Sequence, residues 1–230
     1  TKKGCNDILQ KYYNSECKNA IDWFFINHMN NPMTINPALV KHNNNESIRE
    51  TINNKIKINC YIINLKRCNK KREKMIKKMN QFTEMNYKIY ESIDGQKIDN
   101  DYLKTHDLKS LDEWSDPYHN RKITKGEVGC SLSHYNVYKE ALNDKYDITL
   151  VLEDDAVFSD GFENELRSLL YDLNDLEYDM CYLGRKKMTD INIFEEYINE
   201  KNTFVEPTFS YWCLGYLITR NFCQKIIESN

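Results

Sequence analysis

The chain has 230 residues, of which 40% are hydrophobic and 12% aromatic, enough for one full core with room for an appended segment. A formal net charge of -3 gives no global reason to expect binding to nucleic acid or to an anionic membrane. No apolar run approaches the roughly 20 residues of a membrane helix, and the first ten residues lack a signal-peptide core, so we expect a soluble chain.

Residues 1–55 differ in composition from the rest. An aromatic patch, AIDWFFINHM, precedes a polar stretch with two prolines and a run of asparagines. This composition predicts a terminal extension followed by a linker, with a domain boundary near residue 55. The predicted domain then occupies residues 56–230.

Strand and helix signals alternate after residue 56. INCYIINL predicts a buried strand, and CNKKREKMIKKMNQF predicts a helix with Met75, Met79 and Phe82 on one face. YKIYESIDG predicts a second strand, closed by a turn at Asp94 and Gly95.

The segment ITKGEVGCSLSHYNVYKEAL predicts the next helix, because Thr124 and Glu127 have the spacing of a capping box. Its expected apolar face consists of Val128, Leu132, Tyr135, Tyr138 and Leu142. DITLVLEDD then predicts a strand, GFENELRSLLYDL a helix, YDMCYLG and YWCLGYLIT two strands, and RNFCQKIIES a last helix. This alternation predicts an α/β fold with a mostly parallel central sheet covered by helices on both faces.

The eight cysteines are dispersed along the chain and form no CxxC pair, so the spacing does not predict a zinc site. Cys60, Cys181 and Cys213 lie in apolar predicted strands and are expected to be buried free thiols.

Three adjacent acids, Glu153, Asp154 and Asp155, end the strand DITLVLEDD. In open α/β sheets, ligands bind beyond the carboxyl ends of the strands. Carboxylates there suit Mg²⁺ or Mn²⁺, which takes one or two of them together with substrate phosphate oxygens. A basic side chain or water is an alternative partner, and a plain solvated turn is an equally open interpretation.

Four segments in this order, DPYHNRKITKGEVGCSLSHYNVYKEAL, LVLEDD, YLGRKKM and SYWCLGYLIT, resemble the glycosyltransferase family 25 domain of the collagen-modifying galactosyltransferases. INLKRCNKKREKM and the IDG turn match the beginning of that domain, so the resemblance covers roughly residues 57–228. Bacterial lipooligosaccharide sugar transferases share the TKGE-like, SH and EDD elements, whereas DPYH, GRKKM and SYW are similar to the collagen-modifying branch.

The resemblance implies a GT-A type nucleotide-sugar fold, Mn²⁺ or Mg²⁺, and transfer with inversion from a UDP-sugar. In the collagen-modifying branch the donor is UDP-galactose and the acceptor is hydroxylysine of a collagen-like protein. By position, Glu153 and Asp155 are the implied metal ligands, with Asp155 the first choice. The implied compartment is the lumen of the endoplasmic reticulum, while the cytoplasm, including that of an infected cell, stays open, as does a homodimer.

Further residues acquire expected roles from the same resemblance. The expected donor contacts are Asn64, Arg67, Arg72, Asp94, Lys125, Glu127, His134, Glu153 and Arg185, with Lys186 beside the last. Tyr211 and Trp212 are expected to form an aromatic wall for the acceptor. Plainer roles remain open: solvated cations for the Lys/Arg run, a cap for Glu127, a structural histidine for His134, and core packing for the two aromatics.

The chain departs from the collagen-modifying branch at its end. Members of that branch continue into a PVDEF-like acidic motif, whereas this sequence ends at Ser229 and Asn230. An inverting transfer needs a general base for the acceptor hydroxyl. Asp154 is the candidate within the chain, and a group in the segment beyond residue 230 is the alternative. Two other functions remain open: a non-catalytic scaffold, and a transferase with a glycan acceptor.

Overall fold

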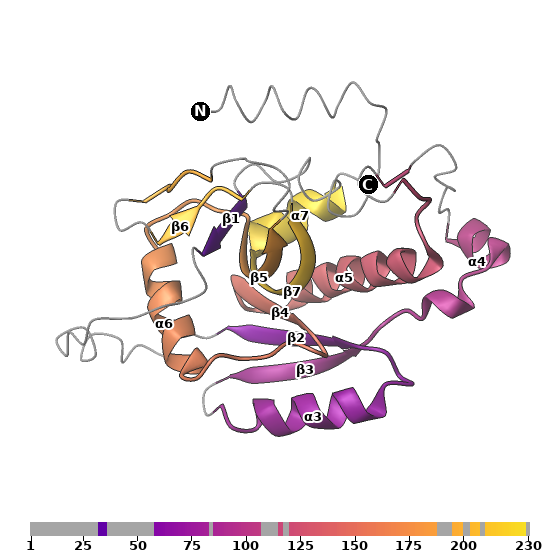
Figure 1. The fold of residues 1–230 in the computed structure, drawn as a ribbon, viewed down its shortest axis with the longest axis horizontal. Helices are drawn as coiled ribbons and strands as arrows, with labels where there is room; N and C mark the ends of the chain where they lie inside the picture. The colour runs from indigo at the N-terminus through magenta and orange to yellow at the C-terminus, as the bar shows by residue number, and fades with distance from the viewer. Residues whose placement is uncertain are drawn as a thin grey trace.

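The computed structural model describes residues 32–35, 58–82, 85–106, 115–116, 120–187, 195–199, 203–207 and 210–228. The predicted aromatic patch at residues 20–29 lies outside these ranges. Within them, seven strands form one sheet in the order β3-β2-β4-β7-β5-β1-β6 (Figure 1). The strands are β1 (Pro32–Ile35), β2 (Asn59–Asn64), β3 (Asn86–Glu91), β4 (Ile148–Glu153), β5 (Met180–Lys187), β6 (Phe204–Val205) and β7 (Ser210–Thr219).

Most strands of the sheet share one direction. Strand β2 pairs in parallel with β3 and with β4, and β1 pairs in parallel with β5. Strand β7 runs antiparallel to both β4 and β5, and β6 runs antiparallel to β1. The predicted α/β class with a mostly parallel sheet is therefore confirmed, while the GT-A type remains a prediction.

Helices cover both faces of the sheet. The described helices are α3 (Asn69–Met79), α4 (Asn100–Thr105), α5 (Lys125–Asn143), α6 (Phe162–Leu173) and α7 (Arg220–Glu228), with a short 3₁₀ helix η3 (Gly95–Lys97). One core lies between the sheet and α3 and α6, and the other lies between the sheet and α5 and α7. Figure 1 shows α3 and α5 on opposite sides of the β2–β3 pair.

Strand β2 shows why two cores form. Cys60 and Ile62 point into the core under α3 and α6, whereas Tyr61 and Ile63 point into the core under α5 and α7. Successive side chains of a strand alternate between faces, so a strand buried on both sides needs a continuous apolar run. The predicted strand in INCYIINL is confirmed for this reason.

Strand β1 comes from the segment predicted to be an extension. It pairs with β5 through the register Pro32↔Met180, Met33↔Cys181 and Thr34↔Tyr182. Part of residues 1–55 therefore adds a strand to the same sheet. The domain boundary near residue 55 stays a prediction.

The carboxyl ends of β2, β3, β4 and β5 meet at one edge of the sheet, and β7 begins there. The start of α5 is fixed to this edge by two glycines. A Cβ on Gly95 would lie 2.2 Å from the carbonyl oxygen of Lys125, and one on Gly129 would lie 2.7 Å from that of Ile93. Only glycine permits so close a backbone approach, which holds η3 against the first turns of the helix.

Candidate functional site

The acidic strand end meets a lysine from the neighbouring βα unit. The Nζ of Lys71, in the first turn of α3, lies 3.2 Å from Asp154 Oδ1 and 2.9 Å from Asp155 Oδ2. Asn64, at the end of β2, donates its side-chain amide to Asp154 Oδ2 over 2.7 Å. These contacts bring the end of β2, helix α3 and the turn after β4 into one polar cluster.

Charge pairing explains how adjacent carboxylates coexist at this edge. The hydrogen bond to Asp155, against some desolvation, raises the pKa of Lys71 to about 12, so the ammonium stays charged at neutral pH. The side chain of Asp154 is 12% exposed and that of Asp155 is 50% exposed. A metal ion, a basic side chain and water were the partners considered from the sequence. In this structure a basic side chain, Lys71, balances Asp154 and Asp155.

Glu153 does not share that lysine. Its Oε1 lies 3.6 Å from the Nε2 of His134, whose imidazole is almost fully buried. His134 Nδ1 in turn lies 2.5 Å from the hydroxyl of Tyr216, which lies 2.9 Å from the hydroxyl of Tyr138. Burial raises the pKa of both tyrosines well above the ordinary range, so both remain neutral and form a fixed hydrogen-bonded row.

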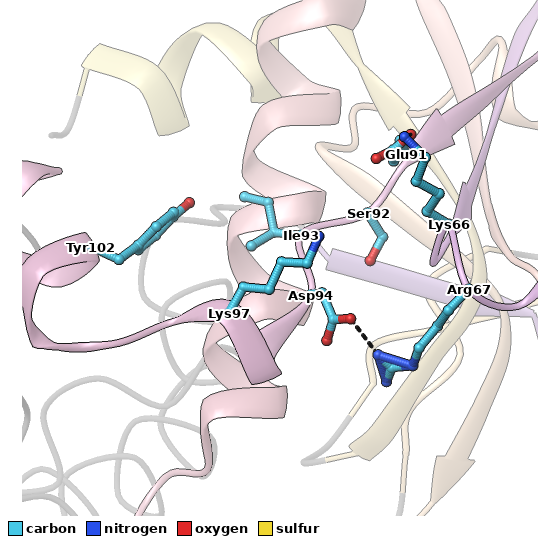
Figure 2. Close-up of a pocket in the computed structure, with 8 residues that line it drawn as sticks. All are labelled: Lys66, Arg67, Glu91, Ser92, Ile93, Asp94, Lys97 and Tyr102. Carbon is cyan, nitrogen blue, oxygen red and sulfur yellow. Dashed lines mark hydrogen bonds and ion pairs between the residues drawn. The ribbon is translucent and has the colours of Figure 1, made fainter.

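A second pair of charges lies beside the first, over the loop after β3. Arg67 donates a hydrogen bond to Asp94 Oδ2 (Figure 2). Asp94 Oδ1 accepts a hydrogen bond from the backbone amide of Gln96. The residues around the pair line a cavity of about 670 Å³: Lys66, Arg67, Glu91, Ser92, Ile93, Asp94, Lys97 and Tyr102. Three cations, two acids and one aromatic ring are among these residues. The cations and the ring are groups that suit a phosphorylated ligand with a ring.

Helix α5 begins at this edge with the predicted capping box. The hydroxyl of Thr124 accepts from the amide of Glu127, and the carboxylate of Glu127 accepts from the amide of Thr124. The two terminal guanidinium nitrogens of Arg121 donate hydrogen bonds to the same carboxylate, over 2.8 and 2.7 Å. These bonds, led by the arginine, hold the pKa of Glu127 at about 2. Lys125 is the first, exposed residue of the helix.

Other predicted site residues lie farther along the edge. Arg185 in β5 makes a two-pronged contact with Glu195, at 2.8 and 2.6 Å, and both side chains are largely buried. Arg72 is exposed on α3. The backbones of Lys186 and Tyr211 are paired across β5 and β7, which places the predicted acceptor segment beside Arg185. The side chains of Lys186, Tyr211 and Trp212 lie outside the described part.

A divalent ion fits the donor set of the acidic cluster. The Nζ of Lys71 marks a position where a cation lies within 3.2 Å of oxygens from both Asp154 and Asp155. Mg²⁺ and Mn²⁺ take one or two such hard oxygens and keep water or substrate oxygens in their other positions. The half-exposed carboxylate of Asp155 leaves room for those ligands. Ligation by Glu153 and Asp155 stays a prediction.

The sequence analysis missed Lys71 and selected Arg67 and Arg72 instead. The charge-balance argument left a metal ion, a basic side chain and water open as partners of the acids, and it did not indicate which member of the Lys/Arg run could reach them. Arg67 makes its contact with Asp94, which follows β3, whereas Asp154 follows β4 on the other side of β2.

Residues 57–230 match the family described as "Glycosyltransferase family 25 (LPS biosynthesis protein)". The chain belongs to glycosyltransferase family 25. Family 25 relatives include human procollagen galactosyltransferase 2, 36% identical over 172 residues, which are 74% of this chain and 27% of that protein. Procollagen galactosyltransferase 1 of Danio rerio is 35% identical over 171 residues, 74% of this chain and 28% of that protein. A glycosyltransferase 25 family member of Aedes aegypti is 34% identical over 171 residues, 73% of this chain and 27% of that protein.

The chain thus matches little more than a quarter of the length of these family 25 relatives. The family assignment makes the polar edge of the sheet the candidate site for a sugar donor. Among the described helices, none has the length and apolar character that crossing a bilayer requires.

Proposed function

We propose that the chain forms the donor site of a metal-dependent galactosyltransferase that uses UDP-galactose and acts, with inversion, on hydroxylysine of a collagen-like protein. One observation carries the proposal: Asp154 and Asp155 converge with Lys71 at the carboxyl edge of the sheet, on which the cavity lined by Arg67 and Asp94 also lies. The galactose and the collagen-like acceptor are supported by the names of the procollagen galactosyltransferase relatives.

Each polar group has a role in this proposal. Asp155 holds hydrated Mn²⁺ or Mg²⁺ together with Glu153, and the ion, when bound, neutralises the leaving diphosphate as a Lewis acid. Arg67 and Lys71 bind diphosphate oxygens, because cationic donors form strong charge-assisted hydrogen bonds to them. Asn64 and Asp94 position the nucleoside.

The remaining predicted groups support the donor or the acceptor. His134 and Glu127 order the edge through Tyr216 and the capping box. Lys125, Arg72 and Arg185 contact the donor in this proposal, from α5, α3 and β5 respectively. Tyr211 and Trp212 belong to the acceptor side, next to the end of β5.

The general base is Asp154 or a group outside residues 1–230. Asp154 accepts hydrogen bonds from Asn64 and Lys71, which hold its carboxylate in place. When the Lys71 ammonium moves from Asp154 to the diphosphate of the donor, Asp154 Oδ1 is free to accept a proton from the acceptor hydroxyl. The compartment proposed for this reaction is the lumen of the endoplasmic reticulum.

A second candidate acceptor is a glycan of the lipooligosaccharide type. The description of the matched family, which names LPS biosynthesis, supports this candidate. The donor site and its metal are the same in both versions. Comparison of hydroxylysine peptides with free glycans as acceptors of the full-length protein distinguishes them.

The donor site is tested by calorimetric titration of UDP-galactose into the 230-residue chain, with and without Mn²⁺. We expect binding that requires Mn²⁺ and is weakened at least tenfold in Asp155→Ala, because the first metal ligand is lost. Asp160→Ala is a matched control, since Asp160 is an exposed acid of the same loop and is expected to bind like the parent chain.

Circular dichroism checks that both variants fold. Metal-dependent binding that survives in Asp155→Ala would contradict the proposed donor site. Absence of any UDP-galactose binding by the folded full-length protein favours a non-catalytic scaffold instead.

A further inference from the structure

A second group of possible metal ligands, which includes sulfur and nitrogen atoms, lies where one turn of α5 faces the end of β4. Cys130 and His134 are four residues apart and therefore lie on one face of the helix. Together with Glu153 they form the one group of three or more His, Cys, Asp or Glu side chains in the described part of the chain whose ligand atoms all lie within 4.8 Å of one another.

The imidazole of His134 is held in the orientation that metal ligands usually have. Its Nδ1 is bonded to the hydroxyl of Tyr216, and its Nε2 faces Glu153 Oε1 across 3.6 Å. Metal-bound histidines commonly donate their second nitrogen to a fixed partner, and the Tyr216 hydroxyl is positioned to accept such a hydrogen bond from Nδ1. In the tautomer with hydrogen on Nδ1, the lone pair of Nε2 faces the Glu153 carboxylate, and a cation between the two would bind both.

The distances and the donor types favour a soft ion. Zn–N, Zn–O and Zn–S bonds of about 2.0 to 2.3 Å put tetrahedral ligand atoms about 3.3 to 3.8 Å apart. The His134–Glu153 separation of 3.6 Å lies within this range, and the Sγ of Cys130 lies within 4.8 Å of ligand atoms of both residues, so metal binding requires only a short movement of the thiol. Thiolate and imidazole select Zn²⁺ over Mn²⁺ and Mg²⁺.

We propose that Cys130, His134 and Glu153 form a Zn²⁺ site distinct from the oxygen cluster of Asp154 and Asp155. Three protein ligands leave the fourth position of the ion open to water. Glu153 belongs to the strand end that carries the proposed donor site, so Zn²⁺ at Cys130 and His134 withdraws this carboxylate from the predicted Mn²⁺ set. Zn²⁺ is therefore expected to oppose Mn²⁺-dependent donor binding.

Titration of the metal-free, reduced 230-residue chain with Co²⁺ tests the site without any sugar donor. We expect near-ultraviolet absorption from a thiolate–Co²⁺ bond and visible bands of four-coordinate Co²⁺, both removed by Zn²⁺, which binds more tightly. Cys130→Ser is expected to abolish the near-ultraviolet band. Glu153→Gln and Tyr216→Phe are each expected to weaken Co²⁺ binding about ten- to a hundredfold.

Cys68→Ser is the matched cysteine control, because Cys68 is half-buried at the start of α3 and is expected to leave the bands unchanged. Asp155→Ala separates this site from the proposed donor site and is also expected to keep the bands. A folded parent chain without the thiolate band, or a Cys130→Ser variant that retains it, overturns the zinc site. Either result leaves the UDP-galactose titration to be judged separately.

Discussion

At the residue scale, Lys71 determines how the acidic strand end is balanced. It contacts two of the three adjacent carboxylates, and its own side chain is 50% exposed. An exposed ion pair of this kind contributes about 0 to 1 kcal/mol to stability. The larger effect of Lys71 is on ligand binding. Its ammonium occupies the position beside Asp154 and Asp155 in which a divalent ion would bind, and its positive charge also attracts a diphosphate.

Lys71→Met is therefore expected to change metal and donor binding in opposite directions. Removal of the positive charge strengthens Mn²⁺ binding to the donor-free chain about fivefold, equivalent to about 1 kcal/mol in a largely solvated site. UDP-galactose binding weakens by a similar factor, because a diphosphate partner is lost. Calorimetry with each ligand measures both constants.

Lys77→Met is the control for this prediction, since Lys77 is an exposed lysine in the last turn of the same helix. We expect it to alter neither constant. Equal weakening of metal and donor binding by Lys71→Met would show that Lys71 only maintains the local structure.

The sequence identified the acids but not their partners. Glu153, Asp154 and Asp155 were recognisable because three like charges at a strand end need compensation. Selection of Lys71 requires the rotation of α3 about its axis, which packing of Met75 and Met79 into the core determines. The short distance from Cys130 and His134 to Glu153 depends likewise on how α5 crosses β4. The spacing of cysteines along the sequence does not predict this crossing.

At the element scale, α5 shows where pattern analysis succeeds and where it stops. The helix and its capping box are confirmed, but of the expected apolar face only Tyr138 is buried, while Val128, Leu132, Tyr135 and Leu142 are partly exposed. The buried positions are Gly129, Ser133, His134, Val137, Tyr138 and Ala141.

The buried face of α5 contains small and polar residues because the loop after β3 lies directly on the helix. Ser133 accepts a hydrogen bond from the amide of Ile93 and donates one to the carbonyl of Gly129. A hydrophobicity pattern cannot identify such a contact, because its requirement is small volume and a hydroxyl group.

Gly129→Ala is expected to destabilise the protein by about 1 to 3 kcal/mol, the usual cost of overpacking. The added methyl would meet the Ile93 carbonyl at 2.7 Å and the Gly95 amide at 2.9 Å, both of them backbone atoms that must shift. Urea unfolding followed by circular dichroism measures the change in the free energy of unfolding.

Gly126→Ala, one turn earlier in the same helix, is the matched control. Its Cβ would meet only Thr124 Oγ1, at 3.8 Å, so alanine is expected to be neutral or to stabilise the helix by up to about 1 kcal/mol. Equal effects of the two substitutions would contradict a close approach at Gly129.

At the scale of the whole molecule, β7 joins two groups of strands that, in the described part of the chain, are connected by strand pairing only through it. Strands β3, β2 and β4 lie on one side of it, and β5, β1 and β6 lie on the other. The sequence predicted the strand itself, but its antiparallel position between β4 and β5 follows from long-range pairing that local patterns do not encode.

Truncation after residue 209 removes β7 and α7 and is expected to abolish cooperative unfolding. The core against α5 loses Tyr216, Ile218, Phe222, Cys223 and Ile226. At about 1.5 to 3 kcal/mol for each large buried side chain, their loss is comparable to the whole stability of a typical domain. Near-ultraviolet circular dichroism measures the loss of tertiary packing, and urea titration measures the loss of cooperative unfolding.

A chain that ends at residue 228 is the control for the truncation and is expected to unfold like the parent. An unchanged unfolding midpoint and steepness after truncation at residue 209 would show that the two groups of strands are stable without β7.

The position of β7 also sets the order in which the sheet is completed during biosynthesis. A ribosome releases β4 and β5 before β7, so the facing edges of both strands are made before the strand that pairs with them. Unpaired strand edges are sites of aggregation, and newly made chains are most exposed to it while such edges persist. Every nascent copy therefore passes through an interval with two open edges, and this interval ends only when residues 210–219 have emerged.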